Sequence, residues 1–313
     1  MTEFNNRLFG LGYKSESFCG WWMGTSGQDR AYYAVYSGCG GKDEGERAQI
    51  ECHRQFFHSL LKHADYGESP MTDEILNEIF KAADEKYPDR LDTRNKEKSA
   101  ASAAFTCLQR EKICGLDRWV LYVGNVGDCR VVLCTNGKAR QLSQDHTLGE
   151  ENSSDIERIL KEGGIIKKFR HASERDAIYV KDRWSDLRYA GPLTRAVGRH
   201  NAKDDEFFII ASREVWLVMS NQEAVDFAQK FELETHSGCH KAASELVEYV
   251  LQLSGATADA VSPTIVIVPL TVYSRVAPAN ANETTVDPNL RPLRSSLDLS
   301  SIPGSYYLLE ETV

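Results

Sequence analysis

Several features that would point to a particular class of protein are missing from this sequence. The chain has no apolar run long enough to span a bilayer, and its first ten residues carry no signal-peptide pattern. Its net charge is −9 and its sequence pI is about 5.5, which argues against a nucleic-acid-binding protein because phosphate backbones select basic surfaces. We therefore expect neither a membrane nor a nucleic acid as a partner.

The cysteines do not form any CxxC pair, the spacing typical of structural zinc sites and of thiol redox motifs. Several of the eight cysteines lie inside apolar stretches that are predicted strands: Cys107, Cys129 and Cys134. We interpret these cysteines as reduced, buried thiols. This pattern is typical of a protein of the cytoplasm or the nucleus.

The composition changes near the carboxyl end of the chain. Hydrophobic residues make up 42% of the 313 residues, enough for a sizeable core. Residues 273–313 instead hold four of the nine prolines and show neither a helical nor a strand period. We predict one domain at residues 1–272 and a flexible tail at residues 273–313.

The central stretch, residues 121–164, has the pattern of strand, hairpin turn, strand, loop and helix. Residues 119–123 and 130–134 are apolar and favour strands. Asn136 and Gly137 follow, and this pair is typical of a tight hairpin in which both central residues need a positive φ. We therefore expect an antiparallel hairpin that turns at these two residues.

A second informative stretch is residues 207–225. It begins with the apolar run FFIIA, which predicts a buried strand. Ser220 and Glu223 have the spacing of a capping box, in which each residue satisfies a backbone N–H group of the other. We expect a helix at residues 222–231.

These two stretches resemble the protein phosphatase 2C (PPM) family of metal-dependent Ser/Thr phosphatases. NVGDCR resembles the family's NVGDSR, and ASREVWLVMSNQEAV resembles its ASDGLWDVMSNQEAV. The resemblance covers roughly residues 10–270. It implies an α+β fold, a four-layer αββα sandwich of two antiparallel sheets flanked by helices.

The resemblance also implies two divalent cations held by carboxylates, but the matching positions in this chain are not acidic. The Asp of the family's DGHGG corner corresponds to Ser37, which precedes Gly38, and the Asp of its SDG motif corresponds to Arg213. A second acid corresponds to Leu217, and the Asp before the closing strand corresponds to Ser262. A hydroxyl brings no negative charge and a guanidinium repels a metal ion, so we predict no metal cofactor.

Two acids of the family pattern remain, Asp128 and Asp145. In some members the acid that matches Asp128 helps to hold a further, weaker metal. The two residues are our candidates for a residual metal or polar site, with weak Mn²⁺ or Mg²⁺ binding as the alternative to no cofactor. Arg199 and Arg213, which replace family acids, are candidates for binding a phosphate without cleaving it.

From this pattern we predict that the chain is not an enzyme. We expect a pseudophosphatase without catalytic residues, acting as a regulatory scaffold in Ser/Thr phosphorylation signalling and binding a protein partner such as a kinase or a phosphoprotein. Two alternatives stay open. One is a weakly active metal-dependent protein Ser/Thr phosphatase with an unconventional metal site, and the other is a structural domain that binds a partner without recognising phosphate.

Overall fold

The fold is taken from a computed structural model. It describes residues 9–13, 19–26, 30–39, 52–54, 56, 71–72, 74–76, 78–80, 100–146, 156–157, 160–161, 164–167, 177–180, 188–189, 195–201, 205–255 and 263–270. The chain divides into two units, Met1–Arg275 and Val276–Val313, and every described residue belongs to the first. The predicted tail lies outside the described residues, so the boundary at residue 272 stays a prediction.

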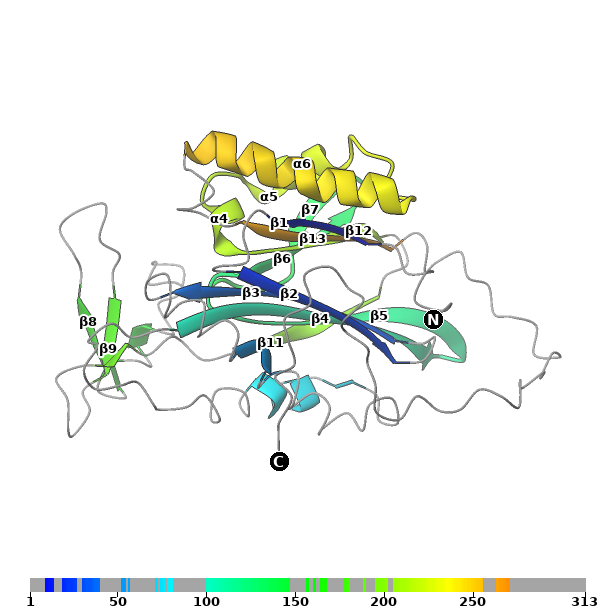
Figure 1. The fold of residues 1–313 in the computed structure, drawn as a ribbon. Helices are drawn as coiled ribbons and strands as arrows, with labels where there is room; N and C mark the ends of the chain where they lie inside the picture. Colours follow the sequence, from blue (N-terminus) through cyan, green and yellow to red (C-terminus); the bar gives the residue numbers. More distant parts are fainter. Residues whose placement is uncertain are drawn as a thin grey trace, which may run out of the picture. The chain divides into compact units, whose positions relative to one another are not determined.

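The described strands form two five-stranded antiparallel sheets and one small sheet (Figure 1). The first sheet has the order β1 (Gly10–Tyr13), β13 (Thr264–Pro269), β12 (Asp205–Ala211), β6 (Arg130–Thr135) and β7 (Lys138–Gln141). The second has the order β11 (Arg195–Asn201), β5 (Leu116–Val126), β4 (Ala100–Ile113), β3 (Arg30–Cys39) and β2 (Cys19–Ser26). The small sheet contains β10 (Arg188–Tyr189), β9 (Ala177–Val180) and β8 (Gly164–Lys167).

One hydrophobic core lies between the two large sheets. Successive side chains of a strand point to opposite faces, so each sheet contributes one face to this core. Tyr33 of β3 meets Phe208 of β12 edge to face, with ring centroids 5.8 Å apart, and neither ring is exposed. Burial of one such side chain stabilises the fold by roughly 1.5–3 kcal/mol, so this core holds the sheets together.

Helical layers cover the outer faces of both sheets. Figure 1 shows α6 (His236–Ser254) lying along the first sheet, with α4 (Arg213–Trp216) and α5 (Asn221–Ala228) beside it. Glycine allows β1 to approach α6 closely: a Cβ atom on Gly12 would lie 2.1 Å from the carbonyl oxygen of Ala243. The second sheet packs against helical residues Phe56, Leu76 and Ile79. The prediction of a four-layer αββα sandwich is confirmed.

The predicted local signals also stand where they were expected. Asn136 and Gly137 have φ values of 51° and 72° in the β6–β7 hairpin. Ser220 and Glu223 form the capping box of α5. This helix ends at Ala228 rather than at residue 231, because the N–H groups of Lys230 and Phe231 donate to carbonyls three residues earlier. No helix among the described residues combines the length and apolarity needed to span a membrane.

Candidate functional site

The turn between β5 and β6 presents Asp128 at the edge of the sandwich. The turn needs Gly127, which has a φ of 76° and whose missing Cβ would lie 2.2 Å from Oγ of Ser102. Ser102, on the neighbouring strand β4, donates a hydrogen bond from its hydroxyl to Oδ1 of Asp128 at 2.9 Å. The backbone and Ser102 therefore fix the direction of this carboxylate.

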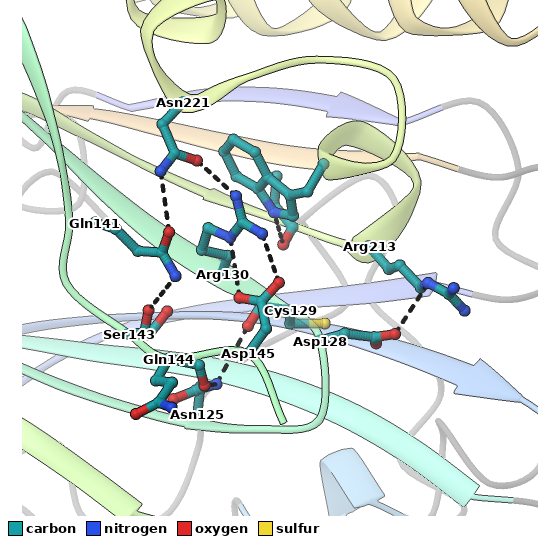
Figure 2. A network of polar contacts seen from close by, with 12 residues as sticks. Asn125, Asp128, Cys129, Arg130, Gln141, Ser143, Gln144, Asp145, Arg213 and Asn221 are labelled. Carbon is teal, nitrogen blue, oxygen red and sulfur yellow. Dashed lines mark hydrogen bonds and ion pairs between the residues drawn. The ribbon is translucent and has the colours of Figure 1, made fainter. Parts of the chain in front are cut away.

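The second oxygen of Asp128 is paired with Arg213, the first residue of α4 (Figure 2). Nε of Arg213 lies 3.0 Å from Oδ2 of Asp128, and the two side chains are 24% and 22% exposed. The terminal nitrogens of Arg213 lie on the side of the guanidinium away from Asp128. Where the family pattern has a metal-binding acid, this chain thus has Arg213, whose positive charge is paired with the retained Asp128.

Glu214 adds a carboxylate that the sequence analysis did not include. Its Oε2 is shielded from solvent and accepts no hydrogen bond from the described residues. Burial raises the pKa of Glu214 above its usual value and the charge of Asp128 raises it further, whereas a hydrogen bond with Ser212 and the charge of Arg213 lower it. The sequence offered one signal for it. In the ASREVW string, Glu214 directly follows Arg213, the position at which the family pattern has an acid.

Asp145 takes part in a separate polar network (Figure 2). Its two oxygens accept hydrogen bonds from Nε and a terminal nitrogen of Arg130, at 2.9 and 2.6 Å. The other terminal nitrogen of Arg130 donates to Asn221 of α5 at 2.6 Å, and its guanidinium lies 5.0 Å from the ring centre of Trp216 in α4. Both oxygens of Asp145 are thus used to join the loop after β7 to two helices.

The loop that carries Asp145 is also fixed directly to the Asp128 turn. Buried Asn125 donates from Nδ2 to the carbonyl oxygen of Gln144 at 2.7 Å. The backbone N–H of His146 donates to the carbonyl oxygen of Gly127 at 2.8 Å. These bonds join the β5–β6 turn to the loop after β7.

The remaining predicted site residues are only partly brought together. Ser37 is buried and pairs across the sheet with Ser102, while Gly38 pairs with Ala101. Leu217, which stands where the family pattern has an acid, is 59% exposed at the end of α4. Two other candidates are less defined: the backbone of Arg199 lies in β11, with its side chain outside the described part, and Ser262 is not among the described residues.

The described residues do not bring together three His, Cys, Asp or Glu side chains that would hold a metal ion. The charge of Asp128 does act on Glu214, and one buried oxygen of Glu214 accepts no hydrogen bond from the described residues. Mg²⁺ and Mn²⁺ prefer such hard oxygen ligands, and one or two carboxylates with water and phosphate complete a typical Mg²⁺ site. As oxygen ligands, these two carboxylates therefore suit one divalent cation.

Comparisons with known proteins give a consistent picture. The family model described as protein phosphatase 2C matches residues 12–257. Protein phosphatase 2C homolog 1 of Schizosaccharomyces pombe is 32% identical over 232 residues, 72% of this chain and 60% of that protein. Probable protein phosphatase 2C 32 of Oryza sativa is 28% identical over 251 residues, 78% of this chain and 59% of that protein. The chain thus spans about 60% of the length of these relatives.

Solved structures support the fold. A serine-threonine phosphatase 2C from Toxoplasma gondii is 16% identical, with a TM-score of 0.54 over 80% of this chain and 94% of that one. A C. elegans sex determining protein is 14% identical, with a TM-score of 0.59 over 85% of this chain and 65% of that one. At these identities the likeness concerns the fold alone.

Two predictions are wrong in the light of these findings: that the chain is not an enzyme and that it has no metal cofactor. The relatives are named as protein phosphatases, and the family depends on Mn²⁺ or Mg²⁺. The error lay in treating each ligand position as indispensable. Hard cations take oxygen ligands in more than one arrangement, and Glu214, one residue along, is an acid on which the charge of Asp128 acts.

The matched region, residues 12–257, contains the Asp128 turn, α4 with Arg213 and Glu214, and strands of both large sheets. The similarity therefore covers the candidate site as well as the scaffold. The chain belongs to the protein phosphatase 2C family.

Proposed function

We propose that the chain is a weakly active, metal-dependent protein Ser/Thr phosphatase with an unconventional metal site. The observation that carries this proposal is the placement of the buried, unbonded oxygen of Glu214 near Asp128 in a protein phosphatase 2C fold. A divalent cation, when bound, supplies an activated water and neutralises charge on the phosphoryl oxygens. Asp128 and Glu214 are the residues that would hold it.

Two other residues of the site, Ser102 and Arg213, orient a ligand and attract the substrate. Ser102 holds Asp128 in place through the 2.9 Å hydrogen bond, so the carboxylate does not reorganise when a cation enters. Arg213 carries a fixed positive charge at the same place, which attracts a phosphoryl dianion. Activity is weak because two carboxylates next to a guanidinium hold a cation less tightly than the acid-rich site of the family pattern.

The proposed protein partner is a phosphoprotein that serves as the substrate. The proposed location is the cytoplasm or the nucleus, and the thiols support it. Six cysteines are free thiols: Cys52, Cys107, Cys114, Cys129, Cys134 and Cys239. Burial raises the pKa of Cys134 and of Cys239 to about 12, which keeps both protonated.

The direct test is hydrolysis of phosphoserine and phosphothreonine peptides by the full chain, with Mn²⁺ or Mg²⁺ and with EDTA. We expect slow turnover that requires the cation and is lost in Asp128→Asn, because the variant removes one of two anionic ligands. Asp226→Asn, a matched change on the exposed side of α5, keeps the turnover. Turnover that is absent, or equal in Asp128→Asn and the natural protein, contradicts the proposal.

A further inference from the structure

We propose that Arg213 and a divalent cation compete for the carboxylates of Asp128 and Glu214, so that Arg213 is a built-in counter-ion that limits loading of the metal site. This inference deepens the proposed function and rests on it only for the class of cation. Arg213 stands at a position where the family pattern has an acid, and the competition is a property of this chain's own residues.

Both oxygens of Asp128 are already engaged. Its Oδ1 accepts the hydrogen bond of Ser102, and its Oδ2 lies 3.0 Å from Nε of Arg213. A cation that approaches this carboxylate must therefore take Oδ2 from Arg213. Because the ion pair is partly exposed and has a single close contact, Arg213 is able to leave without unfolding its surroundings.

One oxygen of Glu214 is unsatisfied. A buried carboxylate oxygen without a hydrogen bond is unfavourable, and it becomes favourable when a positive charge is placed next to it. Asp128 and Glu214 are close enough for their charges to interact. A bound cation would satisfy Glu214 directly, which the single Nε contact of Arg213 with Asp128 does not do.

The charges of the cluster also favour the competition. When both are ionised, Asp128 and Glu214 together carry −2, which matches one divalent cation, but with Arg213 the cluster then carries only −1. Arg213 therefore lowers the affinity of the site in two ways, by occupying an oxygen and by repelling the cation. A neutral side chain at position 213 removes both effects.

The helix α4 stays in place while the side chain of Arg213 moves. Val215 is buried, and Trp216 donates a hydrogen bond from Nε1 to the carbonyl oxygen of Ala211 at 3.1 Å. Trp216 also packs against the guanidinium of Arg130. The helix is thus fixed by its other residues, and the exchange involves the side chain of Arg213 alone. Figure 2 shows its guanidinium at the outer end of the network.

The test is the affinity of the full chain for Mn²⁺, measured by the electron paramagnetic resonance signal of free Mn²⁺. We expect Arg213→Gln and Arg213→Ala to bind Mn²⁺ about tenfold more tightly than the natural protein, the change that corresponds to about 1.4 kcal/mol. The matched control is Arg118→Gln. Arg118 lies on β5, eight residues before Val126 and therefore roughly 26 Å along the strand, so its change leaves the affinity as it is.

Adding Glu214→Gln or Asp128→Asn to Arg213→Gln should remove the whole gain in affinity. Equal affinity of Arg213→Gln and the natural protein overturns the competition, and a gain that persists without Glu214 overturns its role as a ligand. If circular dichroism shows that the Arg213 variants do not fold, Glu214→Gln alone decides: a roughly tenfold loss of Mn²⁺ affinity supports the proposal and an unchanged affinity overturns it.

The same measurements separate this inference from the proposed function. Tighter Mn²⁺ binding by Arg213→Gln, without phosphatase turnover in any variant, supports the competition and refutes the activity. Turnover that needs Mn²⁺, with equal binding by both proteins, supports the activity and refutes the competition.

Discussion

Two arginine–aspartate pairs lie side by side in this molecule, and they differ in almost every physical respect. Arg130 meets both oxygens of Asp145, bonds to Asn221 and packs on Trp216. Arg213 meets Asp128 through one nitrogen and is more exposed. A bidentate pair is strong and geometrically specific, whereas a single, partly exposed contact contributes little. The comparison teaches that the first pair builds the site and the second is exchangeable.

The largest expected effect is that of Arg130→Ala on stability. The change leaves Asp145 without its two hydrogen bonds and removes the contacts with Asn221 and Trp216. We expect the free energy of unfolding to fall by about 2–3 kcal/mol, measured by urea denaturation. Arg118→Ala serves as a control and should cost less than about 0.5 kcal/mol. A loss no larger than that of the control would show that Arg130 does not hold the site together.

Gly127→Ala tests the turn that carries Asp128. An alanine there must adopt a positive φ, and its Cβ would meet Oγ of Ser102. We expect a loss of about 2 kcal/mol in the free energy of unfolding. Gly115 is a useful reference, because it also has a positive φ but nothing lies within 4 Å of its missing Cβ. The difference between the two variants measures the contact with Ser102 separately from backbone strain.

Arg213→Ala should change stability far less than Arg130→Ala. Its one partly exposed contact contributes less than about 1 kcal/mol. The expected result in urea denaturation is a small shift of the midpoint with an unchanged slope. A loss as large as that of Arg130→Ala would mean that Arg213 is a structural residue, and its exchange with a cation would then be too costly.

The smallest expected effect is that of salt. At about 1 M salt the screening length falls to roughly 3 Å, so the cost of Arg213→Ala should disappear there. The cost of Arg130→Ala should stay nearly constant, because the pair is enclosed by Trp216 and Asn221. Parallel denaturation series at about 0.05 M and about 1 M salt give this comparison. Equal salt dependence of the two variants would contradict it.

The fold was largely predictable because its signals are local or belong to a family pattern. Asn136 and Gly137 specify their turn by backbone conformation alone, and Ser220 and Glu223 specify the start of α5 through bonds within four residues. The packing of the two sheets followed from the resemblance and not from periodicity. The end of α5 was misplaced, where a final tight turn replaces regular helix.

The candidate site was less predictable because its contacts join distant parts of the chain. Asp128 and Arg213 are each visible in the sequence, but nothing local indicates that they pair. Asp145 was expected to order its loop or to bind a metal, and its enclosure by Arg130 depends on Trp216 and Asn221 in two later helices. Glu214 was overlooked because matching position by position treats an acid displaced by one residue as an acid lost.

The pairing of β1 with β13 has a consequence for how the domain is made. Gly10 lies opposite Ile267, so the first and last of the described strands complete one sheet together. During synthesis, β1 leaves the ribosome long before its neighbour exists. The edge of that sheet therefore closes only after almost the entire domain has been translated, and until then the early strand is exposed to chaperones and proteases.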